Sequence, residues 1–498
     1  MPVCRLPGSH YFSFLIKIRT MAAEISTAGT ARAKSKHLIE TTTTQQQDQT
    51  EQECEPFFIS IPDLHRVQIT DLRRLGLLDP NSESTAIQLI RQKHAAFLTR
   101  PLRFKENMML PSSYMSLDSS KPWILYWTLQ GLDLIDRLPT EDETLVGVVK
   151  TLESCWTNCS ENEEDGGGFG GGYGQLPHCA TSFAAVSALC IIAGNDRDLY
   201  PEATSLALEL LQRKKSHLLS WFITLRYEVD NGDEKACGYR MHHDGEVDVR
   251  ASYCICVCAS LLDVLTPTVT KGMAEYIMLC QTYEGGFGGE PFAEAHGGYT
   301  YCSIAALHIL AKDRGIDVIK LGMDFKRARG WLSRRQMAFE GGFQGRCNKL
   351  VDGCYTFWIG GAIALLDIFD GVSKFDSGVF REGVDSTGIY RQSPSVSETR
   401  DENGKLTFHQ HLLQRYTLLC GQDVNGGLRD KPSKPRDFYH TCYNLSGLSI
   451  SQHILTDMNS PVISDDEERN VIRATHPAYN IGLERLQHVI QQTYGNKE

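Results

Sequence analysis

The side chains best suited to chemistry stand in two short segments of the C-terminal half of the chain. In the segment 351–358, Asp352 and Cys354 place a carboxylate and a thiol two residues apart, in front of an apolar stretch. In the segment 436–441, His440 stands at nearly the same point relative to the apolar stretch that follows it. A carboxylate, a thiol and an imidazole make three protein ligands, which is the number that catalytic zinc uses while a fourth position stays open. On the residues alone this pattern is weak, because a buried cysteine beside a helix-capping aspartate would look the same.

A second group of side chains is basic and also precedes apolar stretches. His296, Arg346 and Lys349 stand just before predicted helices, with Tyr355 close by in the sequence. Donors that converge on one point can bind a phosphate and stabilise a leaving group that gains negative charge. A solvated pair of loop charges would give the same local pattern, so the residues alone leave both interpretations open.

Both groups belong to a sequence repeat, which predicts how they are positioned. A Gly-Gly-Phe element, with one Gly-Gly-Leu variant, recurs at 167–169, 285–287, 341–343 and 426–428. A helix rich in small residues follows each element, beginning near Ser182, Thr300, Thr356 and Thr441, and a further helix in the same register begins near Ser252. Paired glycines allow positive φ, so they can end one helix and turn tightly into the next. The spacing of about 50 residues suits a helix pair with its connections.

Helical hairpins of this kind can stack as an open solenoid or close into a ring. No region shows the sustained alternation typical of strands, so the predicted fold class is all-α. We expect a closed α/α toroid whose inner ring is formed by the small-residue helices. In such a ring, the segments that carry Cys354 and His440 would be neighbours.

Composition limits the classes of function. The chain has 498 residues, of which 41% are hydrophobic and 22% charged, with a formal net charge of −11. A net acidic protein is a poor candidate for binding nucleic acid, which requires a basic surface. No apolar run approaches the ~20 residues that a transmembrane helix needs. The 16 cysteines are scattered through apolar segments without a secretory signal, which favours free thiols in a reducing, cytoplasmic compartment.

The chain is expected to form one catalytic domain with polar ends. Residues 1–55 include a Thr- and Gln-rich run and are predicted to be a disordered extension, because such a composition buries too little apolar surface. The α/α barrel is expected to span residues 56–490, followed by a flexible tail at 491–498. Two insertions interrupt the repeat: residues 214–235, which could be a longer helix, and the polar residues 370–404, which are interpreted as a surface loop.

At the level of longer motifs, the chain resembles the β subunits of protein farnesyltransferase, the CaaX prenyltransferase β-subunit family. The resemblance covers about residues 85–490 without the insertions, and its motifs lie at 245–250, 294–302, 341–355, 436–443 and 475–482. It implies an α6-α6 barrel of prenyltransferase repeats and a zinc ion bound by Asp352, Cys354 and His440. The implied reaction transfers a farnesyl group from farnesyl diphosphate to the cysteine of a C-terminal CaaX motif, with a zinc-bound thiolate as the nucleophile. The implied partners are an α subunit, which completes a heterodimer, and CaaX proteins such as small GTPases.

The resemblance also assigns roles in the substrate pocket. It implies that His296, Arg346, Lys349 and Tyr355 hold the diphosphate, that Lys349 and Tyr355 assist catalysis, and that Lys431 is a weaker candidate for the same cluster. Asp430 matches the acidic position associated with Mg²⁺, a cation that prefers oxygen ligands. The lipid and peptide sites are implied to include Trp123, Trp127, Arg250, Tyr253, Tyr299, Cys302, Trp358 and Tyr439. Aromatic residues at helical spacing are also common in plain cores.

Trp123 bears on the choice of isoprenoid donor. The resemblance implies a bulky tryptophan at this position in farnesyl enzymes and a small residue in the type I geranylgeranyl enzyme, which is the nearest alternative. A more distant alternative is a terpene cyclase, which needs an aspartate-rich acid motif. The acidic cluster at 464–468 lies in a polar, tail-like stretch. A non-catalytic helical scaffold would have no reason to bring a metal-ligand set together. After His178, the residues Thr181-Ser182-Phe183 follow where the family usually has a proline, so the preference for the last residue of the acceptor is left open.

Overall fold

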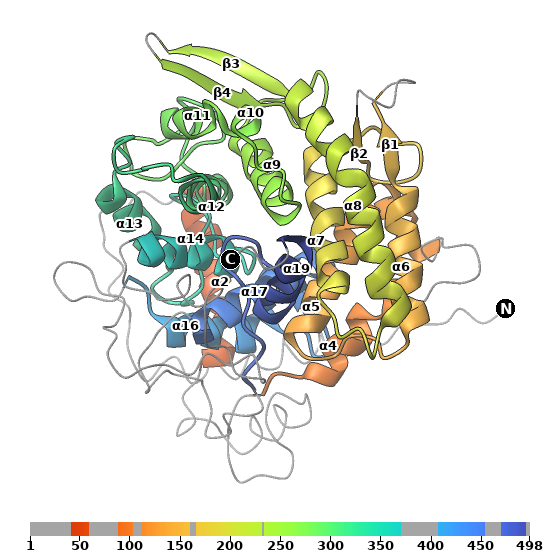
Figure 1. The fold of residues 1–498 in the computed structure, drawn as a ribbon. Helices are drawn as coiled ribbons and strands as arrows, with labels where there is room; N and C mark the ends of the chain where they lie inside the picture. The colour runs from red at the N-terminus through yellow and green to blue at the C-terminus, as the bar shows by residue number, and fades with distance from the viewer. Residues whose placement is uncertain are drawn as a thin grey trace, which may run out of the picture.

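The computed structural model of the protein describes residues 41–58, 88–102, 112–159, 166–231, 234–369, 407–453 and 470–494. Six inner helices form a closed ring in these ranges (Figure 1): α5 (Lys121–Leu134), α7 (Cys179–Ala193), α9 (Val249–Leu261), α12 (Gly297–Arg314), α14 (Tyr355–Phe369) and α17 (Phe438–His453). Each packs against the next, and α17 packs against α5, which closes the ring. The predicted all-α toroid is therefore confirmed.

A second layer of helices surrounds the ring. Its main members are α4 (Arg91–Leu98), α6 (Asp142–Ser154), α8 (Pro201–Thr224), α11 (Met273–Leu279), α13 (Phe325–Ser333) and α16 (Gln410–Arg415), which continues into the π-helical turn η5 (Tyr416–Gly421). Short 3₁₀ segments lie before α5, at η2 (Arg100–Leu102) and η3 (Ser112–Ser120), and the short helix α10 (Pro267–Thr270) precedes α11. The inner helices are buried almost throughout, because their Ala, Gly, Ser and Cys residues let neighbouring backbones approach closely.

The Gly-Gly-Phe repeat has a defined structural role. Gly285, Gly341 and Gly426 all have positive φ, and a Cβ at Gly285 would lie 2.2 Å from the carbonyl oxygen of Arg327. The amide at the third residue of the element donates to the hydroxyl at the start of the inner helix, at 2.9 Å from Phe287 to Thr300. The same bond joins Phe169 to Ser182 at 2.9 Å and Leu428 to Thr441 at 2.8 Å. In these three units the element thus fixes where the inner helix begins relative to the turn before it.

One end of the ring is crossed by the segment 472–482, which leads into α19 (Leu483–Tyr494). Tyrosine hydroxyls from three inner helices donate to its backbone carbonyls: Tyr126 to Asn480 at 2.8 Å, Tyr253 to Ala478 at 3.0 Å and Tyr301 to Pro477 at 2.7 Å. The helix α19 then packs against α7 and α9.

Two expectations about the polar segments need correction. Residues 42–58 form the helix α2 (Thr42–Phe58), although residues 1–55 were expected to be disordered; residues 1–40 lie outside the described part. The helix is stabilised by tertiary contacts that its composition does not reveal, since Cys54 is fully buried against Val351 and Tyr416. The expected tail at 491–498 is helical up to Tyr494, because α19 continues to that residue.

The first insertion, residues 214–235, is in part the longer helix that was considered. It extends α8 to Thr224 and then enters an antiparallel hairpin of β3 (Arg226–Asn231) and β4 (Glu234–Tyr239), which projects from the ring in Figure 1. No strand was expected there, although Tyr227 and Val229 alternate with polar residues in the way that an edge strand does. The second insertion, 370–404, lies outside the described residues.

Four other short strands pair within the connections between helices. They are β1 (Trp156–Asn158) with β2 (Gly167–Phe169), and β5 (Leu428–Arg429) with β6 (Arg436–Asp437), both antiparallel. In the described ranges, no helix is both long and apolar enough to cross a membrane. The cysteines in these ranges carry free thiols, in line with the expectation from the sequence.

Candidate metal centre and substrate pocket

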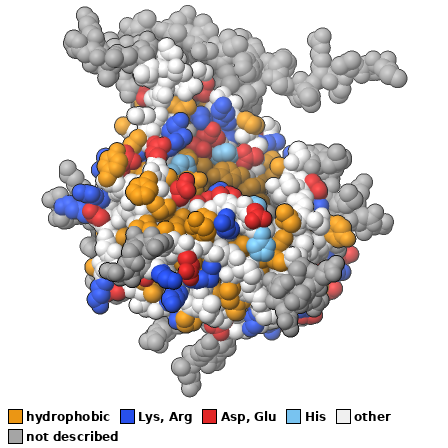
Figure 2. All heavy atoms as spheres, turned by 90° about the horizontal axis from the view of Figure 1, so that it is seen from above, with side chains coloured by type: hydrophobic (Ala, Val, Ile, Leu, Met, Phe, Trp, Pro, Cys, Tyr) orange, Lys and Arg blue, Asp and Glu red, His pale blue; other side chains and the backbone are white. Residues whose placement is uncertain are grey.

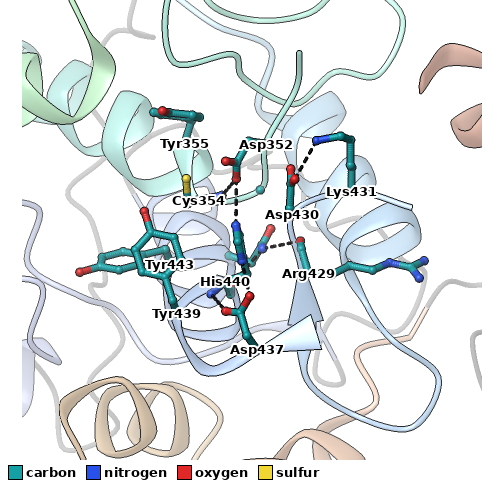
Figure 3. A network of polar contacts seen from close by, with 12 residues as sticks. Asp352, Cys354, Tyr355, Arg429, Asp430, Lys431, Asp437, Tyr439, His440 and Tyr443 are labelled. Carbon is teal, nitrogen blue, oxygen red and sulfur yellow. Dashed lines mark hydrogen bonds and ion pairs between the residues drawn. The ribbon is translucent and has the colours of Figure 1, made fainter. Parts of the chain in front are cut away.

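The proposed metal ligands come together from two adjacent inner helices. Asp352 and Cys354 lie in the turn that leads into α14, and His440 lies in the first turn of α17 (Figure 3). Their ligand atoms all lie within 4.8 Å of one another. The Nε2 atom of His440 is 3.3 Å from Oδ1 of Asp352, close to the roughly 3.4 Å that separates two ligands of a tetrahedral zinc ion. The donor set of one thiol, one imidazole and one carboxylate therefore fits zinc.

The carboxylate of Asp437 orients the imidazole from its other side. One oxygen of Asp437 accepts from the backbone N–H of His440 at 2.7 Å, and the other lies 2.7 Å from Nδ1. Burial would lower the pKa of His440, but its contacts with Asp352 and Asp437 outweigh burial and raise that pKa to about 10. A carboxylate on Nδ1 leaves Nε2 to face the ligand position, which is the arrangement seen around metal-bound histidines.

Burial acts to raise the pKa of both Cys354 and Asp352, but their pKa values shift in opposite directions. Cys354 is 3% exposed, and desolvation, reinforced by the negative charge of Asp352, raises the pKa of its thiol well above the ordinary range. Burial also acts to raise the pKa of Asp352, but the hydrogen bond and charge of His440 outweigh it, so that pKa lies below its usual value. Without a metal, the thiol therefore stays protonated, and the site holds a proton on His440.

A second carboxylate, Asp430, stands beside this group in Figure 3. One of its oxygens lies 2.7 Å from the ammonium of Lys431, whereas its Oδ1 atom is buried and accepts no hydrogen bond from the described residues. Desolvation and the nearby Asp352 together raise the pKa of Asp430. A buried carboxylate oxygen without a donor is a suitable ligand for a hard divalent cation such as Mg²⁺.

Three of the predicted diphosphate residues, His296, Arg346 and Tyr355, lie close together at neighbouring helix starts. His296 caps α12 by accepting from the amide of Gly298 at 3.1 Å, and its Nε2 atom is 3.1 Å from the hydroxyl of Tyr355. Arg346 forms an ion pair with Glu294 at 2.7 Å, and Lys349 is exposed on the same loop. Desolvation, followed by the positive charge of Arg346, lowers the pKa of His296.

The remaining predicted pocket residues continue from this cluster along the inner ring. The ring of Tyr299 lies 5.3 Å from that of His296 and 5.7 Å from the guanidinium carbon of Arg250. Arg250 itself forms ion pairs with Asp248 at 2.5 Å and Glu246 at 3.0 Å. Cys302 is buried on α12. Arg250, Tyr299 and Cys302 therefore lie in the first two turns of α9 and α12, which pack against each other in the ring.

Aromatic side chains from the inner helices α5, α14 and α17 form a wall of the pocket. Trp123 stacks on Trp127 with ring centroids 5.3 Å apart, and Trp127 meets Tyr439 edge-on at 5.5 Å. The indole N–H of Trp358 donates to the hydroxyl of Tyr439 at 3.2 Å. On the face shown in Figure 2, hydrophobic side chains gather in the middle and are surrounded by Lys, Arg, Asp, Glu and His side chains.

The sequence analysis missed some residues of the site. Phe183 lies 5.7 Å from Trp123 and 5.4 Å from Tyr253, so it joins two predicted pocket residues that do not meet directly. Asp437 was quoted within a motif but given no role, although its position three residues before a ligand histidine at a helix start was a usable signal. Tyr443, whose ring lies tilted against that of Trp358 with centroids 4.3 Å apart, is one helical turn after Tyr439.

A pocket of about 570 Å³ opens beside this wall, and Trp123, His178, Ala180 and Thr181 are among its lining residues. Thr181 is the first of the three residues, 181–183, at which the chain departs from the family pattern. Its hydroxyl donates to the carbonyl of Phe169 at 2.6 Å, so it already has a partner within the chain.

The closed ring of helices and the family match define a toroidal prenyltransferase. Residues 89–481 match the family model of the prenyltransferase alpha-alpha toroid domain. The chain is 35% identical over 450 residues to the protein farnesyltransferase β subunit of Arabidopsis thaliana, covering 83% of this chain and 84% of the relative. It is 36% identical over 399 residues to the β subunit from Pisum sativum, with 73% and 87% covered. The chain belongs to the protein farnesyltransferase β-subunit family of prenyltransferase enzymes.

Two further comparisons concern geranylgeranyl enzymes. Identity to the geranylgeranyl transferase type-1 β subunit of Arabidopsis thaliana is 26% over 373 residues, covering 70% of this chain and 84% of the relative. A structure of Candida albicans protein geranylgeranyltransferase-I complexed with GGPP superposes with a TM-score of 0.56 at 20% identity, covering 82% of this chain and 99% of that one. The second likeness supports the toroid fold alone. Membership of an enzyme family excludes the non-catalytic scaffold considered from the sequence.

Proposed function

We propose that this chain is the catalytic β subunit of a protein farnesyltransferase that transfers a farnesyl group from farnesyl diphosphate to the cysteine of a C-terminal CaaX motif. The observation that carries the proposal is the convergence of Asp352, Cys354 and His440 beside the side chains of His296, Arg346 and Tyr355. The enzyme would work as a heterodimer with an α subunit, as the β-subunit names of its relatives imply. CaaX proteins such as small GTPases are the proposed acceptors.

In the proposed site, Asp352, Cys354 and His440 would hold one zinc ion. A zinc ion bound there would lower the pKa of an acceptor thiol that takes its open position, and so would supply a thiolate at neutral pH. Asp437 keeps the imidazole of His440 in one orientation through its contact with Nδ1. The Oδ1 atom of Asp430, which lacks a donor, would hold Mg²⁺ beside the diphosphate.

The basic cluster would bind the diphosphate and stabilise it as it leaves. His296, Arg346 and Lys349 would donate to the phosphate oxygens, and the hydroxyl of Tyr355 would add a further donor. Charge develops on these oxygens as the bond to the isoprenoid carbon breaks, so fixed donors stabilise the transition state more than the ground state. The aromatic side chains would bury the lipid and exclude water, and their faces can favour cationic character at the reacting carbon. Arg250 and Tyr299 would contact the peptide side of the pocket.

Type I geranylgeranyl transfer remains the alternative activity. Trp123, whose indole stacks on Trp127 and lies tilted against Phe183, would favour the shorter donor, because so bulky a side chain would occupy space that a longer isoprenoid needs. The higher identity to farnesyltransferase β subunits favours the same conclusion.

The deciding experiment is co-expression of the chain with an α subunit, followed by parallel assays with labelled farnesyl and geranylgeranyl diphosphate on a CaaX peptide. We expect farnesyl transfer that requires zinc and the peptide cysteine, with geranylgeranyl transfer much slower. A complex that prefers the twenty-carbon donor would establish the alternative. A zinc-loaded complex that transfers neither group would contradict the proposal.

A further inference from the structure

A short stretch of backbone passes behind the metal ligands and touches both segments that carry them. The carbonyl of Asp430 accepts from the amide of Gly353, the residue between Asp352 and Cys354, at 2.8 Å. The same carbonyl accepts from the hydroxyl of Tyr416 at 2.6 Å. Both lone pairs of this oxygen are therefore used, and its position is fixed from two sides.

The preceding carbonyl is fixed in the same way from α17. The Nδ2 atom of Asn444 donates to the carbonyl of Arg429 at 3.1 Å and to the carbonyl of His440 at 2.9 Å. Asn444 is fully buried, so these bonds are shielded from water. One side chain thus connects the strand β5 to the residue that supplies the imidazole ligand.

The two sets of contacts meet at Gly353. A Cβ at this position would lie 2.4 Å from Nδ2 of Asn444 and 2.8 Å from the carbonyl oxygen of Arg429. The turn between the two ligands of α14 therefore packs directly on the side chain and the backbone that hold the third ligand. A displacement of the Arg429–Asp430 backbone would move the turn with the thiol relative to the helix with the imidazole.

We propose that Tyr416 and Asn444 are positioning residues that set the spacing of Asp352, Cys354 and His440 by fixing the Arg429–Asp430 backbone between their two helices. Neither residue is a ligand, and neither belongs to the substrate pocket described above. The proposal rests on the metal centre of the proposed function. It extends that function to the outer helical turn η5, which carries Tyr416. Residues that orient metal ligands typically change metal affinity by 10- to 100-fold when they are replaced.

The test uses Tyr416→Phe and Asn444→Ala in the complex with the α subunit, with zinc affinity measured by competition with a chelator. A second readout is the absorption of the cobalt-substituted complex, in which the cobalt–thiolate bands report ligand geometry. Tyr200→Phe is the matched control, because the hydroxyl of Tyr200 also donates to a backbone carbonyl, that of Pro139, at 2.8 Å but on the outer layer. The thermal midpoint of each variant separates an effect on the metal centre from a loss of stability.

We expect zinc affinity to fall roughly 10-fold in each variant, with altered cobalt bands, and to remain within twofold of wild type in Tyr200→Phe. Tyr416→Phe keeps the shape of the side chain, so it tests the proposal even where Asn444→Ala folds poorly. Wild-type zinc affinity and an unchanged cobalt spectrum in Tyr416→Phe would overturn the proposal, while the zinc site itself would stand. A wild-type complex that holds no zinc would remove both the metal centre and its positioning residues.

Discussion

The imidazole of His440 lies between two carboxylates, that of Asp352 at Nε2 and that of Asp437 at Nδ1. Its raised pKa leaves a proton on Nε2 at neutral pH. A metal ion that binds Nε2 has to displace this proton, because a ligating imidazole must be neutral at the nitrogen that binds. The contact of Asp437 with Nδ1 would remain with the metal bound and would then fix the tautomer. The thiol of Cys354 would have to lose a proton as well, so metal binding at the proposed centre would release protons.

The thiol ligand gives the first prediction at this scale. Cys354→Ala should abolish zinc retention and turnover, since two remaining ligands hold zinc far more weakly than three. Metal analysis of the purified complex measures the effect. Cys190→Ala is the control, because Cys190 is a fully buried thiol on the inner helix α7, away from the proposed ligands. One tightly held zinc ion per Cys354→Ala complex would refute the ligand assignment.

The indole of Trp123 gives the second prediction at the residue scale. Trp123→Thr should shift the ratio of kcat/KM toward the twenty-carbon donor, because each additional CH₂ that becomes buried contributes ~0.8 kcal/mol. Parallel assays with the two donors give this ratio. Trp123→Phe keeps an aromatic ring at the same position and should retain most of the preference for farnesyl. Unchanged selectivity in Trp123→Thr would remove the main structural argument for the shorter donor.

The ligand residues could be proposed from the sequence because their types, their spacing and the family motifs agree. Tyr416 and Asn444 could not, because their role depends on the Arg429–Asp430 backbone passing behind Gly353. That neighbourhood arises only when η5, β5 and α14 are packed together. Asp437 is an intermediate case. Its position three residues before His440, at a helix start, would have allowed its role to be predicted, but no role was assigned to it.

At the scale of elements, α2 shows how packing overrides composition. Its sequence is mostly polar, but Thr50 and Cys54 are four residues apart on one face and are buried, with Phe57 packed nearby. Two hydrogen bonds add to these contacts. Gln47 donates to the carboxylate of Glu340 at 2.8 Å, and the carboxylate of Glu53 accepts from the hydroxyl of Ser433 at 2.8 Å. A short apolar face on a polar helix gives a weak periodic signal, so the sequence favoured disorder instead.

The helix α2 covers the neighbourhood of the proposed positioning residue Tyr416, which leads to a prediction about truncation. Removal of residues 1–58 should expose Val351, Tyr416 and Leu419 and lower the thermal midpoint, with a loss of about 3 kcal/mol of stabilisation for the apolar contacts removed. Removal of residues 1–40 is the control, because it leaves the contacts of α2 in place. Scanning calorimetry of both truncated complexes measures the difference. Equal midpoints for the two would show that α2 does not stabilise the toroid.

At the scale of the whole molecule, closure of the ring was predicted from the repeat. The side-chain contacts that join its first and last units were not predicted. His94 of α4 lies 2.8 Å from Oε1 of Gln422 through Nε2 and accepts from the amide of Gly427 at 2.9 Å. This contact joins the first helical hairpin to the last Gly-Gly element. The repeat predicts that neighbouring units pack, but the side chains that join the first unit to the last are outside its pattern.

The closure contact predicts a dependence of stability on pH. Burial lowers the pKa of His94 from its usual value of 6.5 to about 4. The unfolded chain therefore takes up a proton below about pH 6.5 that the folded chain resists down to about pH 4, so stability falls as the pH falls through this window. Between pH 7 and pH 5 the loss from this one group is about 2 kcal/mol.

His94→Asn removes the titrating ring, so the variant should be less stable at pH 7 but lose less stability between pH 7 and pH 5 than wild type. Thermal midpoints at the two pH values give the comparison. His243→Asn, which alters an exposed histidine, is the control and should keep the wild-type difference. An identical pH difference in wild type and His94→Asn would show that the closure contact does not titrate as inferred.

The segment 472–482 has a further consequence for how the protein is made. The hydroxyls of Tyr126, Tyr253 and Tyr301 come from three separate repeats, and all donate to this one late stretch of chain. While a ribosome is still synthesising the last repeat, these hydroxyls lack the carbonyls to which they donate in the finished protein, and the face of α5 that meets α17 lacks its partner helix. The growing chain therefore exposes the inside of an unfinished ring until almost all of it has emerged, and holding this surface apart from other nascent chains becomes a task for chaperones.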